Sequence, residues 1–293
     1  MLIEEQYKHK LIKTLIAFDS FCKDNNLRYF ASGGTAIGAV RHKGMIPWDD
    51  DIDVVMIRED YDRFLSLKEQ LHGSQYQILS PTDKGYYLPY PKFVDANTTI
   101  WEVADHEFLI GVYIDVFPLN HVSDDIDKIK NFQKKYLRVC AHYFGSEKCL
   151  FRKTVLQSLA LSHPKTIKNW ISHLLISKPL RRYFKRLFWR YEGMLKDSKG
   201  NRLLNYYTQY EMEKELLLPQ WFERQIRLPF EDTEINIMNG YENYLTQLHG
   251  NYMILPPIEK RVSHHSRYFI NLDRRMTLEE IKEFMKKNAV HEG

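Results

Sequence analysis

The sequence predicts an α/β fold that carries a helical insertion. Apolar residues repeat at steps of three and four in residues 2–25 and 58–71, which is typical of helices. Short runs rich in β-branched residues, such as 51–57 and 111–117, lie between and after them and predict strands. Because helices and strands follow one another in this way, we expect one sheet with helices packed against it.

The predicted core spans residues 1–122 and begins with the helix at 2–25, which Asn25-Asn26 ends. A strand is expected at 27–32, followed by a short helix that Gly33-Gly34 opens. The remaining strand candidates of the core are 51–57, 76–79, 88–95, 98–103 and 111–117.

Two further regions complete the predicted organisation. Residues 123–215 form the helical insertion, which starts with a helix at about 124–143. Residues 216–293 form a C-terminal segment that is expected to pack back on the core, with short strands near residues 228–237 and a helical turn at 241–248. Thr277-Leu278-Glu279-Glu280 has the pattern of a capping box and predicts a final helix to about residue 287.

The composition is that of an ordinary globular protein. The chain has 293 residues, of which 27% are charged and 44% hydrophobic. No run approaches the 18 or more apolar residues of a membrane span, and the first residues lack the order of a signal peptide. The three cysteines, Cys22, Cys140 and Cys149, show no metal-ligand spacing and cannot all pair. We therefore expect a reduced, cytoplasmic protein without a cysteine-built zinc site.

One segment is strongly basic. Residues 148–190 contain eleven Lys or Arg residues and no Asp or Glu, whereas the rest of the chain is net acidic. Its last part, 180–189, has Leu and Phe on one side and Arg or Lys with Trp189 on the other. This texture fits a helix lying in an anionic membrane surface, and equally a helical insertion packed on the core with a solvated basic face. No nucleic-acid-binding motif accompanies it, so we expect no nucleic-acid partner.

The most informative stretch runs from residue 31 to residue 53. Gly33-Gly34-Thr35 lies between a strand and a helix, where backbone N–H groups can approach a phosphate. Asp49, Asp50, Asp51 and Asp53 then place four carboxylates in five positions. Asp51 and Asp53 are two residues apart, so on a strand both point to one face. Such a pair is suited to a hard divalent cation beside a phosphate, while a solvated acidic turn is the alternative.

Asp115 is a second acidic signal, since it interrupts the apolar run Gly111–Phe117. A carboxylate inside an apolar strand needs a partner. That partner is either a nearby Lys or Arg, or a metal ion shared with Asp51 and Asp53.

Several cations are candidates for binding phosphate or sugar. Arg41 and His42 follow the short helix, and Lys92 stands alone in a predicted strand, where protection of a sheet edge is its alternative role. A second group follows Pro256-Pro257, and its adjacent histidines lack the spacing of a helical zinc pair. The members of this second group are Lys260, Arg261, His264 and His265.

The combination of Gly-Gly, Asp-x-Asp and a later strand Asp resembles the nucleotidyltransferase superfamily. Residues 29–64 and Asp115–Leu119 resemble the LicD family of bacterial phosphorylcholine transferases, with fukutin-type phosphotransferases as distant relatives. The segments around Pro229–Ile237 and Gly240–Leu245 fit the same family. The resemblance implies a nucleotidyltransferase-like core with a mixed sheet.

The resemblance also implies a chemistry. The enzyme would move phosphocholine, or a similar phospho-alcohol, from CDP-choline or a related CDP-alcohol to a sugar hydroxyl, releasing CMP. The acceptor would be a lipid-linked precursor of teichoic acid, lipopolysaccharide or another cell-surface glycan, so that the enzyme would act peripherally at the inner face of the plasma membrane. Asp51, Asp53 and Asp115 would hold Mg²⁺ or Mn²⁺, with Asp115 also the base, and Gly33, Gly34 and Thr35 would receive the donor phosphates.

A quaternary ammonium group is best held by aromatic faces. The aromatic residues nearest to these motifs in the sequence are candidates for such a cage, namely Trp48, Tyr86, Tyr87, Tyr90 and Trp101.

Two other functions use the same parts. One is a nucleotidyltransferase that adds NMP from an NTP to a small-molecule hydroxyl. The other is a non-catalytic protein that binds a glycolipid through an inactive transferase core.

Overall fold

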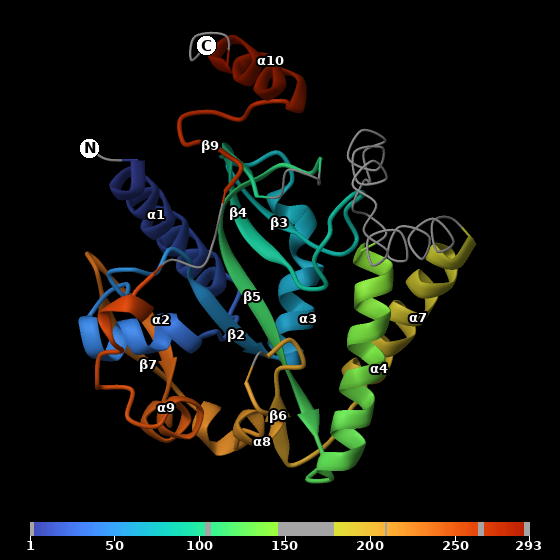
Figure 1. The fold of residues 1–293 in the computed structure, drawn as a ribbon. Coiled ribbons are helices and arrows are strands. Elements are labelled where there is room, and N and C mark those ends of the chain that lie inside the picture. The colour runs from blue at the N-terminus through green and yellow to red at the C-terminus, as the bar shows by residue number, and fades with distance from the viewer. Residues whose placement is uncertain (1–2, 103–106, 146–178, 209, 263–266, 290–293) are drawn as a thin grey trace.

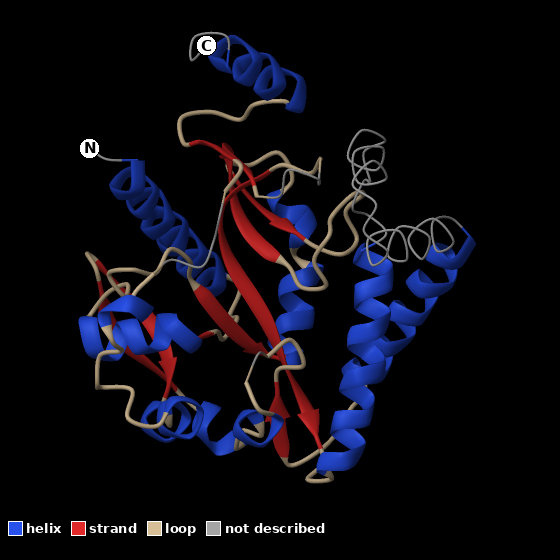
Figure 2. Ribbon diagram, in the orientation of Figure 1, coloured by secondary structure: helices blue, strands red, loops and turns tan. Residues whose placement is uncertain are grey.

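A mixed sheet forms the centre of the molecule (Figures 1 and 2). The computed structural model describes residues 3–102, 107–145, 179–208, 210–262 and 267–289. The main path of the sheet has the order β1-β2-β5-β4-β3, with β6 beside β5 and β9 beside β4. Its strands are β1 (Phe30–Ala31), β2 (Asp53–Ile57), β3 (Tyr76–Leu79), β4 (Lys92–Trp101), β5 (Ile110–Val122), β6 (Arg202–Leu204) and β9 (Phe269–Asn271).

The register of the sheet brings three charged residues together. Strands β2 and β5 are parallel, and Asp53 pairs with Asp115 across them. Strands β4 and β5 are antiparallel, and Lys92 pairs with the same Asp115. Because parallel and antiparallel pairs share one sheet with helices around it, the predicted α/β class with a mixed sheet is confirmed.

Two helices cover one face of the sheet. Phe18 of α1 (Ile3–Asp24) packs edge-on against Phe64 of α3 (Arg58–Ser66), with ring centroids 6.0 Å apart. The same Phe18 contacts Phe93 of β4 at 5.4 Å. These fully buried rings hold α1, α3 and the sheet in one hydrophobic core, as the apolar spacing of both helices predicts.

The strands differ from the prediction in four places. Strand β1 is shorter than 27–32, and Asp51 precedes β2 rather than lying in it. The two strands expected at 88–95 and 98–103 are one strand, β4, whose pairing with β5 shifts register between Asp95 and Ile100. Strand β5 continues through Pro118, because its parallel pairing with β2 extends the ladder beyond the point where proline usually ends a strand.

The insertion contributes both a helix pair and a strand. Helix α4 (Ile126–Gly145) packs along α7 (Pro179–Lys196), and Phe188 is buried between them. Residues 146–178, most of the basic segment, lie outside the described residues. Strand β6 pairs with β5, so this part of the chain also extends the central sheet.

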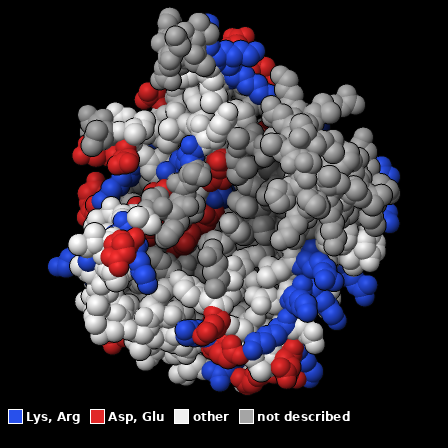
Figure 3. Space-filling view, viewed as in Figure 1, with Lys and Arg blue, Asp and Glu red and all other residues white. Residues whose placement is uncertain are grey.

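The sides of α7 have different surroundings. Phe184, Leu187 and Phe188 belong to the core that α7 shares with α4. Arg182, Lys185, Arg186 and Arg190 are exposed, together with Tyr183 and Trp189. In the space-filling view, Lys and Arg side chains gather over the region of α4 and α7 (Figure 3). The apolar side is thus occupied by protein, as the packed-insertion alternative predicts, and the basic side faces solvent.

The C-terminal segment contacts the core through a hairpin and a helix. Strands β7 (Gln225–Phe230) and β8 (Thr233–Met238) form the hairpin, and helix α9 (Tyr241–His249) follows it. The short helix α8 (Met212–Glu215) precedes the hairpin. Helix α10 (Leu278–Ala289) begins with the predicted capping box, in which Glu280 accepts from the Thr277 N–H at 2.6 Å and donates its own N–H to Thr277 Oγ1.

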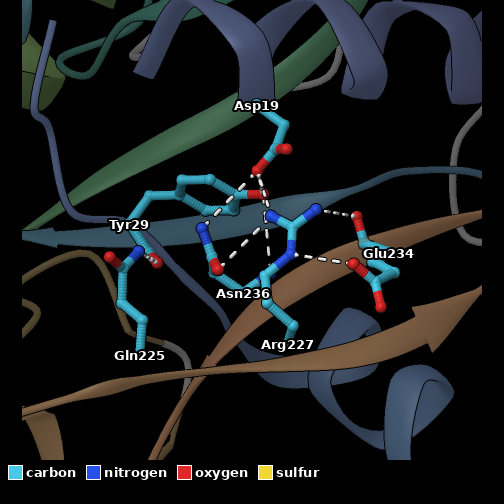
Figure 4. A network of polar contacts seen from close by, with 6 residues as sticks. All are labelled: Asp19, Tyr29, Gln225, Arg227, Glu234 and Asn236. Atoms are coloured by element: carbon cyan, nitrogen blue, oxygen red, sulfur yellow. Dashed lines mark hydrogen bonds and ion pairs between the residues drawn. The ribbon is translucent and has the colours of Figure 1, made fainter. Parts of the chain in front are cut away.

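A polar network fastens the hairpin to α1 (Figure 4). Arg227 of β7 donates to Asp19 of α1 at 2.6 Å, and the Tyr29 hydroxyl donates to the same carboxylate. Asn236 donates a weaker hydrogen bond to Asp19 from β8. Gln225 donates to the backbone carbonyl of Tyr29 at 2.9 Å. Residues separated by about two hundred positions are thereby joined on one side of the sheet.

None of the helices in the described parts of the chain combines the length and apolar character needed to cross a membrane. Cys22 and Cys140 are buried and not bonded to one another, and Cys149 lies outside the described residues.

Candidate active site

The loop that contains Gly33 and the strand that begins at Asp53 are tied together. The Ser32 N–H donates to the Asp53 carbonyl at 3.0 Å. The Asp53 N–H in turn donates to Thr35 Oγ1 at 2.9 Å. Thr35, expected to contact the donor phosphates, therefore has its buried hydroxyl engaged with the backbone of an acidic site residue. This pair of contacts fixes where the Asp53 side chain leaves the sheet.

A cavity of about 540 Å³ opens at this point. Asp51 and Asp53 line it with Asp115, so the three predicted metal ligands share one space. Acidic side chains lie beside a hollow on this face of the molecule (Figure 3). The other lining residues are Ser32, Gly33, Gly34, Asp49, Val55, Tyr90, Phe117, Leu119, Asn205, Tyr207, Thr208, Tyr210, Glu215, Leu217 and Tyr244.

The carboxylates disfavour one another's negative charge. Burial raises the pKa of Asp53 well above its ordinary value, and Asp51, Asp115 and Asp49 raise it further, while Lys92 opposes them. Burial likewise raises the pKa of Asp115 to about 6, against the lowering effect of Lys92. The carboxylate oxygens of Asp49, Asp50 and Asp51 also lie within 4.8 Å of one another. The ionised form of these carboxylates is therefore stabilised by a positive charge that binds beside them.

These residues fit a hard divalent cation. Mg²⁺ and Mn²⁺ take oxygen ligands and bind beside phosphate groups. The chain offers carboxylate oxygens from the loop before β2, from β2 itself and from β5, and all of them face one cavity. The donor set therefore suits the predicted ion.

Lys92 lies against Asp115 and not at the cavity wall. Its Nζ is 2.8 Å from Asp115 Oδ1 and 3.1 Å from Oδ2, and it stands 3.3 Å above the centre of the Tyr113 ring. Both partners of the ion pair are almost fully buried. Since β4 has neighbours on both sides, edge protection is excluded as its role. Lys92 instead holds the Asp115 carboxylate in position.

Arg267 supports the acidic loop in the same way. Its guanidinium is 2.8 Å from Asp50 Oδ2 and donates to the Asp50 carbonyl at 3.0 Å. It also stacks over Tyr7 of α1, 3.9 Å from the ring centre. Asp50 is therefore held by a cation, whereas Asp49 and Asp51 line the cavity. Sequence reasoning missed Arg267 because it lies 217 residues from Asp50.

The two glycines differ in what surrounds them. Gly33 has φ +51, a left-handed conformation that favours glycine, and its N–H donates to the Tyr244 hydroxyl at 3.2 Å. Gly34 has no such torsion, but a Cβ placed on it would stand 2.5 Å from Asp49 Oδ2. Glycine at position 34 therefore makes room for an acidic side chain of the site.

The predicted phosphate-binding cations form a separate cluster beside this loop. Arg41 donates to the Tyr252 carbonyl at 2.6 Å and to His42 at 3.0 Å. Arg261 lies over Trp48, which immediately precedes the acidic residues, at 5.3 Å. Burial and then the charge of Arg261 lower the pKa of Arg41, and burial followed by Arg41 lowers that of His42. Mutually repelling cations at a half-buried position are suited to an anion.

The remaining predicted cations and the aromatic candidates have the following surroundings. Lys260 is exposed in a short helical turn, Ile258–Lys260. His264 and His265 lie outside the described residues. Of the five aromatic cage candidates, Tyr90 lines the acidic cavity and Trp48 lines a neighbouring one. Tyr86 packs against Phe108, and Trp101 against Tyr268.

The segment after β6 supplies cavity residues that sequence reasoning did not find. Tyr207, Thr208, Tyr210 and Glu215 line the cavity, and Tyr244 joins them from α9. Glu215 lies in the charged run Glu211–Glu215, which is typical of a solvated helix. Nothing in this local pattern indicates that one of its carboxylates is buried.

Comparisons with known proteins point to one family. The family model described as LicD/FKTN/FKRP, nucleotidyltransferase domain, matches residues 26–157. The chain is similar to the lipopolysaccharide cholinephosphotransferase LicD of Haemophilus influenzae, with 32% identity over 250 residues that cover 85% of this chain and 90% of the relative.

Two uncharacterised proteins are similar over a shorter region. The protein from Rickettsia typhi is 43% identical over 54 residues, or 18% of each chain. The protein from Rickettsia prowazekii is 53% identical over 54 residues, or 18% of this chain and 20% of the relative.

Proposed function

The chain belongs to the LicD family, and on this premise we propose that it transfers phosphocholine, or a similar phospho-alcohol, from a CDP-linked donor to a sugar hydroxyl. The acceptor is a cell-surface glycan precursor, of the lipopolysaccharide or teichoic acid kind. The similarity to a lipopolysaccharide cholinephosphotransferase supports the transferred group and the glycan acceptor. One structural observation carries the proposal: Asp51, Asp53 and Asp115 share a cavity with Gly33 and Gly34.

A divalent cation belongs to this proposal. Asp51, Asp53 and Asp115 would hold Mg²⁺ or Mn²⁺, and Asp49 lines the same space. When bound, the ion would offset the negative charge of the two donor phosphates beside the carboxylates. It would also offset the burial and the carboxylate repulsion that together raise the pKa of Asp53.

The residues of the chain have distinct parts in the transfer. The acceptor oxygen forms a bond to the phosphorus that carries choline, and the bond from that phosphorus to CMP breaks, with the electron pair leaving on CMP. Asp115 receives the proton of the acceptor hydroxyl, since it is the carboxylate that lines the cavity from β5. Lys92 keeps the Asp115 carboxylate oriented toward the cavity.

The cationic cluster suits the acceptor side of the reaction. Arg41, His42 and Arg261 stand next to Trp48, at the other end of the acidic loop from β2. A phosphate carried by the glycan precursor would bind there.

Location at a membrane surface is part of the same proposal. The exposed basic residues of α7 (Arg182, Lys185, Arg186 and Arg190) stand beside exposed Tyr183 and Trp189. Each cation near an anionic leaflet contributes on the order of 1 kcal/mol, so that several together give reversible attachment. A lipid-linked acceptor would then be reached at the inner face of the plasma membrane.

The test separates this function from its alternatives by the product released. The protein is incubated with Mg²⁺, an oligosaccharide acceptor and in turn CDP-choline, CDP-ribitol and CDP-glycerol, and CMP is measured. Release of CMP from at least one donor supports the proposal. Pyrophosphate release from an NTP, with no CMP from any CDP-alcohol, identifies a nucleotidyltransferase instead. Binding of glycolipid without turnover of any donor identifies a non-catalytic protein.

A further inference from the structure

The acidic cavity has a second group of lining residues that the proposed transfer does not use. It consists of four tyrosines and one carboxylate. Tyr207, Tyr210 and Glu215 come from the segment after β6, Tyr244 from α9, and Tyr90 from the loop before β4. These residues belong to the same space as Asp53 and Asp115, so that one bound molecule of moderate size can meet both groups.

Glu215 is the buried carboxylate at the end of the cavity that the segment after β6 supplies. It is only 5% exposed, and its side chain accepts a hydrogen bond from Thr208 Oγ1 at 2.6 Å. Across the described residues, no Lys, Arg or His forms an ion pair with it. Of the other buried carboxylates, Asp60 and Asp115 pair with Arg28 and Lys92 respectively. Asp95 is also buried and, in the described residues, is held by hydrogen bonds from Gln75 and Asn97.

The absence of a cation beside Glu215, in the part of the chain described, has an energetic consequence. Burial raises the pKa of Glu215 to about 7, because its negative charge is removed from water without an opposite charge nearby. A ligand that brings a positive charge into the cavity would stabilise the ionised carboxylate. The site therefore favours a cation over a neutral group of the same size.

The tyrosines lie around this carboxylate and the acidic cluster. Burial raises the pKa of Tyr210 to about 12, with Glu215 and then Asp53 adding to the effect. Burial, followed by Glu215, also raises the pKa of Tyr244, and Asp53 contributes. Both phenol groups are therefore close enough to Glu215 and to Asp53 to interact electrostatically with each. The Tyr244 hydroxyl is further held by the Gly33 N–H at 3.2 Å.

The remaining aromatic rings continue the same wall. The Tyr90 ring lies 5.5 Å from that of Tyr207 and 4.4 Å from that of Phe117. Tyr207 is anchored by a hydrogen bond from its hydroxyl to the Pro89 carbonyl at 3.2 Å. The cavity thus has a fixed aromatic surface and a buried carboxylate.

We propose that Glu215, with Tyr210 and Tyr244, forms the subsite that receives the quaternary ammonium group of the donor. This inference rests on the proposed function and specifies the orientation of the donor in the cavity. The phosphates lie at the Asp cluster and the cationic head lies at Glu215. Aromatic faces and a carboxylate are the groups that recognise a quaternary ammonium ion, which has no N–H to donate. The subsite thereby selects a cationic phospho-alcohol over a neutral polyol.

The test compares two donors that differ in charge but not in shape. One is CDP-choline, and the other is its neutral carbon isostere, CDP-3,3-dimethylbutanol, in which carbon replaces nitrogen. For the wild-type protein we expect KM for CDP-choline to be about tenfold lower than for the isostere, as 1 to 2 kcal/mol of cation recognition implies. In Glu215→Gln the preference should disappear, because KM for CDP-choline rises about tenfold while KM for the isostere changes less than about twofold.

Two further variants keep the readout specific. Tyr210→Leu should raise KM for CDP-choline more than for the isostere, since the ring is lost but the apolar volume is kept. Glu215→Asp, which keeps the charge, should retain part of the preference. Affinity for CMP, which lacks the head group, should be unchanged in all three variants.

The outcomes distinguish this subsite from the function on which it rests. Equal use of the two donors by the wild type overturns the subsite, and this result needs no variant to fold. Equal loss of both donors in Glu215→Gln also overturns it, because the residue then acts on folding or on the phosphates. If the wild type releases CMP from neither donor and from no other CDP-alcohol, the proposed function fails, and the subsite with it.

Discussion

Asp53 and Asp115 stand opposite each other on the parallel strands β2 and β5, and both line one cavity. This pairing explains why two residues 62 positions apart act as one acidic centre. It also contributes to the raised pKa of Asp53, because Asp53 is partly buried and the buried Asp115 carboxylate lies beside it. The arrangement is unfavourable for an empty anionic site and favourable for one that receives a divalent cation.

The first prediction concerns Asp53→Asn. Removing one carboxylate from the cavity should lower kcat/KM by at least about 100-fold, as loss of a charge-stabilising group does in other enzymes. The same variant should be more stable than the wild type in EDTA, because a repelled buried charge is gone. Thermal unfolding and steady-state kinetics measure the two effects.

The exposed Asp232 at the tip of the β7–β8 hairpin provides the matched control, since Asp232→Asn removes the same charge from a residue that does not line the cavity. Adding Mg²⁺ and CDP-choline should raise the Tm of the wild type and of this control, but not that of Asp53→Asn. Equal Tm shifts in all three proteins would contradict the metal assignment.

The second prediction concerns Gly34→Ala. The new Cβ would stand 2.5 Å from Asp49 Oδ2, so the carboxylate must move. We expect donor affinity and kcat to fall while the protein remains folded, by far-UV circular dichroism. Gly193→Ala is the control, because nothing lies within 4 Å of a Cβ at that position on α7. Unchanged donor affinity in a folded Gly34→Ala protein would show that this loop does not shape the site.

The third prediction concerns Lys92→Met. The change leaves Asp115 buried without its ion-pair partner. Such a loss should lower the free energy of unfolding by about 3 to 5 kcal/mol. Chemical denaturation measures it. Lys128→Met is the control, since its pair with Asp125 is exposed to solvent and should contribute little to stability. Similar effects of the two changes would mean that Lys92 does not support Asp115.

The fourth prediction is a pH dependence that Glu215 contributes. The ordinary pKa of 4.5 is raised to about 7 by burial, so between these values the folded state keeps a proton that the unfolded state has released. Stability should therefore fall as the pH rises from about 4.5 to about 7, by roughly 3 kcal/mol, and then level off. Thr208, Tyr210 and Tyr244 are the polar groups that face this carboxylate.

Glu215→Gln removes this dependence without changing shape. The difference in Tm between the variant and the wild type should grow with pH across that window, in favour of the variant. A constant difference from pH 4.5 to pH 8 would show that Glu215 is not a buried, unpaired acid.

The fifth prediction concerns the basic side of α7. Wild-type protein should co-sediment with phosphatidylserine-containing vesicles at low salt and dissociate at high salt, because the attraction is screened. Changing the exposed residues Arg182, Lys185, Arg186 and Arg190 together to Glu should abolish binding and leave turnover of a soluble acceptor intact. Lys286 and Lys287 of α10, changed to Glu, serve as a control for reversing exposed basic residues on another helix. Wild-type protein that stays in the supernatant at low salt would favour the packed insertion alone.

The acidic centre was predictable from the sequence because its signals are local. Asp115 is a charged residue inside an apolar strand. Asp51 and Asp53 are carboxylates two positions apart at the start of another apolar run. Each signal is visible within a few residues of sequence. The capping box at Thr277 was predictable for the same reason, since both partners lie within one turn.

Other parts of the site depend on contacts that no local pattern carries. Tyr244 meets Gly33 across 211 positions, and Arg267 meets Asp50 across 217. Lys92 was found as an isolated cation, but its partner became clear only from the pairing of β4 with β5. Glu215 has the surroundings of a surface helix in the sequence, and tertiary packing alone buries it.

We propose that this chain transfers a phosphocholine-type group by means of the carboxylates on β2 and β5. The most direct test incubates wild-type protein and Asp53→Asn with Mg²⁺, CDP-choline labelled in the choline methyl groups, and a lipopolysaccharide core oligosaccharide, and measures label in the oligosaccharide together with CMP. We predict equal amounts of labelled oligosaccharide and CMP with the wild type, and neither with Asp53→Asn or in excess EDTA. Undiminished transfer by Asp53→Asn, or pyrophosphate as the product of the wild type with an NTP and no CMP from CDP-choline, would contradict the claim.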